Sequence, residues 1–303
     1  MFKSSTEKRY FWVGFCLVIL GAFGFSAKAI IIKLAYAADN QVDAITLMAL
    51  RMLFSLPFFL LVAIWHNKKS HPTPLDKRQW LIIVLLGLIG YYVSSYLDFT
   101  GLHFISAGLE RVILFLYPTF VVLFSALAYK KTITLHTLLA LVLGYSGMVL
   151  VFIEQLSLAS SAIWLGSALV MASAVIFAFF TMGSGVMTLR IGSTRFTAYT
   201  MTVASVATLL HFAIQHGIAL TTLPINVYVL ALIMAIFSTV LPAFFMNAGI
   251  RRIGASNASI ISTTGPIGTL VLAFFILHES ITLNQLAGTC LVLAGVYVVS
   301  RTK

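Results

Sequence analysis

Long apolar stretches, each close to 20 residues, follow one another along nearly the whole chain and constrain its fold more than any other feature. A helix needs about 20 apolar residues to cross the hydrocarbon core of a bilayer. Short connections separate the stretches, so we expect no soluble domain between them. The ten predicted spans are Phe11–Leu34, Ala44–Trp65, Trp80–Phe99, Ser106–Ala128, Leu135–Phe152, Ile163–Val186, Phe196–Ile214, Val227–Ala248, Ala255–Leu277 and Leu283–Ser300.

The composition supports the same fold class. Of the 303 residues, 60% are hydrophobic and only 9% are charged, whereas soluble domains are about half apolar and about a quarter charged. So few charges do not cover the surface of a water-soluble globule of this length. The sequence therefore predicts an all-α integral membrane protein of ten transmembrane helices.

The basic residues predict the orientation. The net charge of +11 does not indicate a nucleic-acid partner, because the basic residues occur in short clusters between apolar runs. With a cytoplasmic N-terminus, 15 of the 19 Lys and Arg fall in cytoplasmic segments and none in outer loops. Those 15 are Lys3, Lys8, Arg9, Lys68, Lys69, Lys77, Arg78, Lys130, Lys131, Arg190, Arg195, Arg251, Arg252, Arg301 and Lys303. Both termini are thus expected to be cytoplasmic.

An internal repeat accompanies this topology. When residues 101–150 are aligned with residues 249–298, at an offset of 148, 11 of the 50 positions are identical. They include the pairs Gly101/Gly249 and Pro118/Pro266, which shared apolar composition alone does not align. Each half holds five helices, an odd number, so the second half enters the membrane in the opposite orientation. We expect two inverted repeats, residues 1–153 and 154–303, as in secondary transporters.

Pro118 and Pro266 fall near the middle of the fourth and ninth predicted spans. A proline lacks the backbone N–H and leaves a helical carbonyl without its usual donor. Within a membrane, protein or a wet cavity must satisfy that carbonyl. Two interpretations remain open, a kink that serves packing and a kink that serves gating.

Two stretches resemble the signatures of a known family. The segment beginning at Ile105, ISAGLERVILFLYPTFVVLFSALAYKKTIT, is similar to the first-half signature of EamA-domain proteins of the drug/metabolite transporter superfamily. The segment beginning at Ile253, IGASNASIISTTGPIGTLVLAFFILHESIT, is similar to the second-half copy, with Glu279 before the last helix. The resemblance implies ten helices, inverted repeats and efflux of metabolites or amino acids across a bacterial inner membrane. The chain departs from the pattern at Lys130–Lys131, where many members carry an acidic residue.

Ionisable side chains within spans are costly unless they are paired or hydrated, so each is a functional candidate. Apart from Lys33, which is near enough to the outer surface to extend into it, they are Lys28, Arg51, Asp98, Glu110 and Arg111. All fall in the outer half of the membrane. One interpretation is an ion-pair network that closes the outer ends of the first four helices. The other is a polar cavity that binds substrate or relays a proton.

Helical spacing adds two aromatic candidates. Tyr91 shares a helix face with Asp98, and Tyr117 shares one with Glu110. A cavity with charge at one level and aromatic rings at the next suits a small polar molecule with an apolar part. A tyrosine at helical spacing is more often a packing residue than a ligand, and that interpretation stays open for both.

These features favour a secondary transporter that exports a small polar or zwitterionic metabolite, such as an amino acid, by alternating access. No Walker phosphate loop is found in the sequence, so ATP is not expected to drive it. Three cations against two carboxylates favour a zwitterionic or anionic substrate. Glu110 or Asp98 is a candidate carrier of a coupling proton, and passive exchange remains equally open.

Other classes of function leave weaker signals. A lipid flippase and a channel-like facilitator share the same helix pattern and remain alternatives. A membrane-embedded enzyme is not expected, because Gly144-Tyr145-Ser146-Gly147 lacks the spacing of a G-x-S-x-G nucleophile motif. No two histidines have metal-ligand spacing on one helix. We therefore expect no metal site and no cofactor, and the bilayer and a small molecule as the partners.

Overall fold

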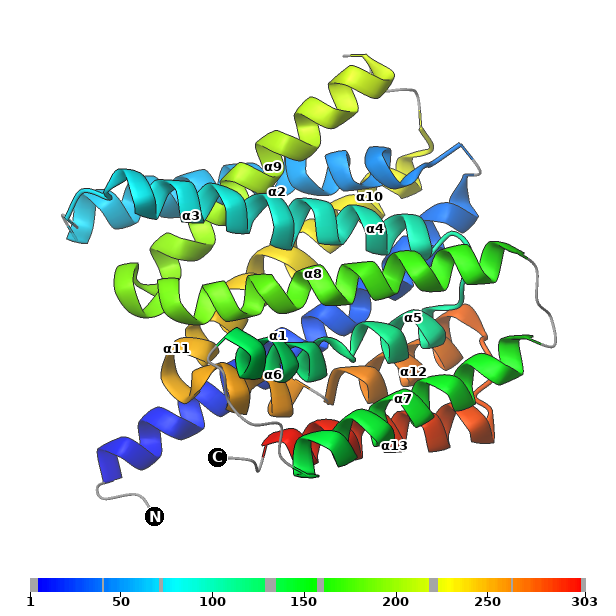
Figure 1. The fold of residues 1–303 in the computed structure, drawn as a ribbon. Coiled ribbons are helices and arrows are strands. Elements are labelled where there is room, and N and C mark those ends of the chain that lie inside the picture. The colour runs from blue at the N-terminus through cyan, green and yellow to red at the C-terminus, as the bar shows by residue number, and fades with distance from the viewer. Residues whose placement is uncertain are drawn as a thin grey trace.

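The computed structural model describes residues 5–39, 41–70, 73–128, 135–156, 161–217, 223–262 and 264–300, and within these ranges the chain is helical with no strand. Figure 1 shows long helices that lie side by side in one bundle. The elements are α1 (Ser5–Ala38), α2 (Ala44–Ser70), α3 (Lys77–Gly87), η1 (Leu88–Val93), α4 (Ser94–Gly101), α5 (Ala107–Leu114), α6 (Tyr117–Ala128), α7 (Leu135–Leu156), α8 (Ser161–Ile191), α9 (Ser193–His216), α10 (Ile225–Ala235), η2 (Ile236–Val240), α11 (Leu241–Ser262), α12 (Thr264–Leu277) and α13 (Leu283–Ser300).

Six helical stretches of the described residues are long and apolar enough to cross a membrane. They are Arg9–Ala38, Ala44–Lys69, Lys77–Gly101, Ser161–Ile191, Ser193–His216 and Ile225–Gly254. Two shorter apolar helices cover Gly268–Leu277 and Leu283–Gly295. Large apolar side chains remain exposed on the outer faces, for example Ile214, Phe275 and Leu135. Such a surface suits lipid and not water, so the chain is a multi-pass membrane protein.

One predicted span is interrupted within the described part of the chain, and one expected connection is helical. The fourth, expected as one helix from Ser106 to Ala128, is divided at Phe115–Leu116 into α5 and α6. Pro118 is the second residue of α6, where its missing N–H costs no helical hydrogen bond. Its ring cannot donate to the carbonyl of Leu114, so the first helix ends there. α11 bends at Gly254, whose φ of 81° favours glycine.

Pro266 is the third residue of α12, and its side chain lies outside what the structure describes. The basic residues Lys3, Lys130, Lys131, Arg301 and Lys303 also lie outside the described residues.

Two short π-helical segments, in which the hydrogen-bonded turn is one residue wider than in an α-helix, occur at corresponding places. Segment η1 begins at Leu88 and η2 begins at Ile236, which are separated by the same 148 residues as the sequence repeat. π-Helical turns are rare and are frequent at functional sites. Gly90 and Tyr91 in η1, and Ser238 and Thr239 in η2, all line the cavity described below.

The helices cross at closely packed glycines. The backbone of Gly101 in α4 lies so near α8 that a Cβ added there would be 2.9 Å from the carbonyl oxygen of Gly166. A Cβ on Gly249 in α11 would be 3.2 Å from the carbonyl oxygen of Gly14 in α1. Small residues let helix backbones approach closely in a membrane. As Figure 1 shows, α7 and α13 form a further pair along one side of the bundle.

Candidate functional site

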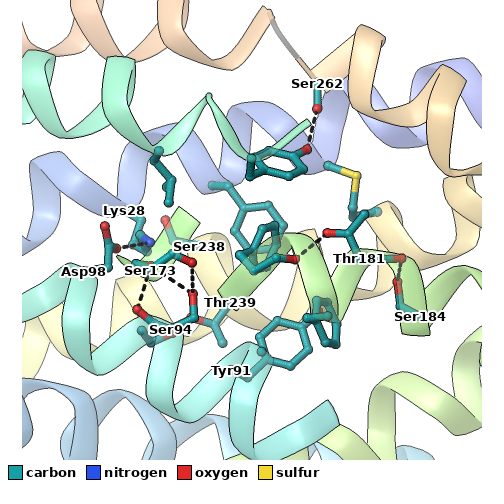
Figure 2. A pocket seen from close by; sticks show the side chains of 18 of the residues that line it. Lys28, Tyr91, Ser94, Asp98, Ser173, Thr181, Ser184, Ser238, Thr239 and Ser262 are labelled. Atoms are coloured by element: carbon teal, nitrogen blue, oxygen red, sulfur yellow. Dashed lines mark hydrogen bonds and ion pairs between the residues drawn. The ribbon is translucent and has the colours of Figure 1, made fainter. Parts of the chain in front are cut away.

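A cavity of about 120 Å³ lies between the helices. Its lining comes from α1, α2, η1, α4, α5 and α6, and from α8, α9, η2 and α11. Figure 2 shows side chains from several of these elements pointing into the same space. Elements far apart in the sequence therefore build one site.

One part of the lining carries charge. Nζ of Lys28 lies 2.5 Å from Oδ2 of Asp98, an ion pair between α1 and α4 in which Asp98 is almost fully buried. Figure 2 shows this pair at the edge of the pocket. The carboxyl group of Glu110 also lies within hydrogen-bond distance of the Asp98 carboxylate. Asp98 is therefore contacted by both Lys28 and Glu110.

Arg111 and Glu110 follow each other in α5 and are both buried. Nε of Arg111 lies 3.6 Å from Oε2 of Glu110, and Nη2 of Arg111 donates to the carbonyl oxygen of Phe25 at 2.9 Å. Arg111 lines the cavity, whereas Glu110, which we expected to face it, is not among the lining residues. Glu110 lies outside the cavity lining, close enough to Asp98 for the two carboxyl groups to interact.

Arg51 lines the cavity from α2 with 4% of its surface exposed. Its guanidinium group lies over the ring of Phe99, 4.7 Å from the centroid. Nε and Nη2 of Arg51 find no hydrogen-bond partner in the described part of the chain. No carboxylate there lies within ion-pair distance of it either. The site therefore holds one buried cation without an ion pair.

Aromatic and sulfur-containing side chains form another wall. The rings of Tyr91 and Phe180 are 4.7 Å apart, those of Phe177 and Phe180 are 5.5 Å apart, and those of Phe177 and Tyr117 are 5.1 Å apart. Met201 belongs to the same apolar cluster as Tyr91 and Phe180. The structure thus brings the predicted residues Tyr91 and Tyr117 into one continuous surface of the cavity.

Hydroxyl groups that sequence reasoning missed also line the cavity. The hydroxyls of Ser94 in α4 and Ser173 in α8 are 2.9 Å apart, a contact drawn in Figure 2. The buried hydroxyls of Ser238 and Thr239 have no hydrogen-bond partner among the described residues. Serines are common in apolar helices, so their presence alone does not indicate a site. The usable signal in the sequence was that Ser238 and Thr239 align with Gly90 and Tyr91 at the offset of 148 residues.

The connections between helices hold further polar contacts. The carboxylate of Glu279 accepts from the backbone N–H groups of Ala107 and Gly108, at 3.2 and 3.4 Å, at the start of α5. Oδ2 of Asp43, which follows α1, lies 2.9 Å from Nε2 of His216 at the end of α9. Burial tends to raise the pKa of Asp43, but hydrogen bonds from Thr46 and His216 outweigh it and hold the pKa below its ordinary value.

In the part of the chain that the structure describes, no group of three or more His, Cys, Asp or Glu side chains is placed to hold a metal ion. Cys16 and Cys290 are free thiols on exposed positions. The cavity lining offers cations, hydroxyls and aromatic rings to a ligand.

Comparison with known proteins decides the family. The model of the EamA-like transporter family matches residues 12–153 and again residues 164–301. The chain belongs to the EamA-like transporter family. The resemblance seen in the two signature segments thus extends over nearly the whole sequence, in two copies.

Relatives of this EamA-like protein carry matching names. An uncharacterized transporter of Bacillus subtilis, YcbK, is 31% identical over 282 residues, which cover 91% of this chain and 88% of the relative. An uncharacterized inner membrane transporter of Salmonella typhimurium, YicL, is 23% identical over 98% of this chain and 96% of its own. A solved crystal structure superposes with a TM-score of 0.68 over 98% of this chain and 100% of its own, at 16% identity, and shares the fold.

Proposed function

We propose that this EamA-like protein is a secondary transporter that exports a small polar or zwitterionic metabolite, such as an amino acid, by alternating access. The observation that carries the proposal is the cavity, whose lining joins the charged residues Lys28, Arg51, Asp98 and Arg111 to an aromatic wall. Buried charges are expensive in a membrane and mark substrate or ion pathways. The Nε–Nη2 edge of Arg51, which has no hydrogen-bond partner among the described residues, offers a positive charge to the anionic group of such a substrate.

Alternating access in such transporters rests on inverted repeats. We propose ten spans in two inverted five-helix repeats, residues 1–153 and 154–303. The double match of the family model and the equal spacing of η1 and η2 support this arrangement. So do the two glycine crossings, in which each half contributes its third helix to one crossing and its first helix to the other. The interruption before Pro118, and Pro266 at the start of α12, are the proposed points of bending.

Contacts between loops support the alternation of the spans. Asp43 pairs with His216, and Glu279 binds the start of α5. Asp43, His216 and Glu279 fall in loops predicted to be outside, and the start of α5 is at the outer end of the fourth predicted span. Arg195 donates to the carbonyl oxygen of Thr73 at 2.9 Å, and both fall in loops predicted to be inside. With the basic residues on that second side, the termini are proposed to be cytoplasmic in a bacterial inner membrane.

A further part of the proposal concerns what drives transport. Asp98 and Glu110 are buried carboxyl groups within electrostatic reach of each other and of cations. Such a group can exchange a proton when a substrate or a conformational change alters its surroundings. We propose Asp98 or Glu110 as the site of a coupling proton, with passive exchange as the alternative that an imposed pH gradient distinguishes.

The test is uptake by counterflow in proteoliposomes, with a panel of radiolabelled amino acids and organic acids and protein-free liposomes as control. A transporter gives saturable uptake of a defined subset of the panel. A lipid flippase instead moves a labelled phospholipid across the bilayer and carries none of the solutes. A channel-like facilitator gives conductance or uptake that does not saturate. Either of these results would overturn the proposal.

A further inference from the structure

The charges in the cavity do not balance. Three cations and one carboxylate line it, because Glu110 lies behind the lining. Lys28 has Asp98 as its ion-pair partner, and Arg111 has Glu110 and the carbonyl oxygen of Phe25. Arg51 is left without an ion pair among the described residues. A buried cation without a counter-charge is unfavourable, so the site favours an anionic group on whatever enters it.

The geometry of Arg51 specifies which anionic group fits. Its two unpartnered nitrogens, Nε and Nη2, lie on the same edge of the planar guanidinium group. The two N–H groups of that edge point in parallel and match the two oxygens of a carboxylate. The face of the group is occupied by the ring of Phe99, at 4.7 Å, which fixes the plane and leaves the edge for a ligand.

The aromatic wall lies at a different level of the cavity. Tyr91 precedes Asp98 by seven residues in one continuous stretch of helix, which is about 10 Å along the axis. Phe180 follows Ser173 by the same interval in α8, and the rings of Phe180 and Tyr91 make an edge-to-face contact. Figure 2 shows Lys28, Asp98, Ser94 and Ser173 gathered in one part of the pocket and Tyr91 in another. The hydroxyls of Ser94 and Ser173 thus lie on the side of the charged residues.

We propose that the Nε–Nη2 edge of Arg51 binds the carboxylate of the substrate, and that the wall formed by Tyr91, Phe177 and Phe180 receives its apolar side chain. The substrates are then small carboxylic acids with an apolar side chain, and the carboxylate decides recognition. This inference rests on the proposed function and goes beyond it, because it assigns the two ends of the substrate to named residues.

The experiment compares each acid with the amide in which a neutral carboxamide replaces the carboxylate. The probes are three matched pairs: L-leucine and L-leucinamide, L-phenylalanine and L-phenylalaninamide, and 4-methylpentanoate and 4-methylpentanamide. Dissociation constants are measured by isothermal titration on purified protein in nanodiscs. In at least one pair, the wild-type protein should bind the acid about 10- to 100-fold more tightly than the amide, the range for a charge-assisted pair of hydrogen bonds.

Arg51→Gln should remove that preference, because it should weaken binding of the acid and leave binding of the amide unchanged. Arg51→Lys should retain part of the preference. Arg195→Gln is the matched control, because Arg195 is also buried but does not line the cavity. It should keep the full preference. Thermal unfolding of each variant shows whether it folds, and the ratio of acid to amide within one variant is independent of the folded fraction.

Three results would overturn the inference: amides bound as tightly as acids, an acid preference that survives in Arg51→Gln, or no binding of any of the six compounds. The proposed function fails separately. If counterflow shows saturable transport of other solutes while these acids are neither bound nor carried, the chain is a transporter and Arg51 is not its carboxylate site.

Discussion

Lys28 in α1 and Asp98 in α4 form an ion pair of 2.5 Å beside the cavity, and it ties together two helices separated by 70 positions in the sequence. Removal of either partner leaves the other charge buried and alone, which costs about 3 kcal/mol or more. Lys28→Met and Asp98→Asn should each lower the thermal unfolding temperature markedly. The double variant should lose less stability than the two single variants lose in sum. Additive losses would show that the pair contributes nothing as a pair.

Glu279 should act as a distant cap for α5. Its carboxylate accepts from two backbone N–H groups at the N-terminus of that helix, where a negative charge is also favourable. Glu279→Gln should destabilise the protein by about 1–2 kcal/mol, measured by thermal unfolding. Ser280→Ala, at the exposed neighbouring position, should change stability little. Equal effects of the two changes would contradict the capping role.

Gly101 is expected to tolerate no side chain. A Cβ there would be 2.6 Å from Cγ2 of Val170 and 2.9 Å from the carbonyl oxygen of Gly166, so α4 and α8 would have to separate. Gly101→Ala should cost about 1–3 kcal/mol. Gly144→Ala is the control, since its nearest neighbour is the flexible side chain of Leu116 at 3.3 Å. A neutral Gly101→Ala would mean that the crossing is looser than described.

The orientation is testable by thiol labelling in a background where Cys16 and Cys290 are replaced by serine. Single cysteines at Gln41 and Lys77, both exposed, should react from opposite sides of the membrane. An impermeant reagent added to intact cells should label position 41 and leave position 77 unmodified until the cells are opened. Labelling of both positions in intact cells would rule out the proposed topology and, with it, the inverted repeat.

The all-helical fold class and the six helical stretches long enough to cross a membrane could be predicted from the sequence, because span length and hydropathy are local properties. The bend at Gly254 falls in the connection expected between the eighth and ninth spans. The interruption at Phe115–Leu116 was not expected, because an apolar run with one proline has the same composition whether it bends or breaks. The π-helical segments η1 and η2 were missed for a similar reason, since one widened turn does not alter the apolar pattern.

The candidate site was predictable only in part. Charged residues within spans can be recognised in the sequence because a charge is costly to bury in a membrane. The structure brings Lys28, Arg51, Asp98 and Arg111 to one cavity. Glu110 follows the same rule but lies behind the lining, because the direction of a side chain depends on how α5 is rotated against its neighbours. The contact between Ser94 and Ser173 joins residues 79 positions apart, and no local pattern predicts such a pairing.

The most direct test of the account is whether transport passes through the central cavity. Ser95 lines that cavity, and Ser146 is exposed on the outer face of α7. Counterflow of the solute that the wild-type protein carries best should fall to the level of protein-free liposomes in Ser95→Phe, which fills the cavity, in a protein that still folds. The same substitution at Ser146 should leave transport close to wild type. Undiminished transport by a folded Ser95→Phe variant would contradict the cavity as the pathway.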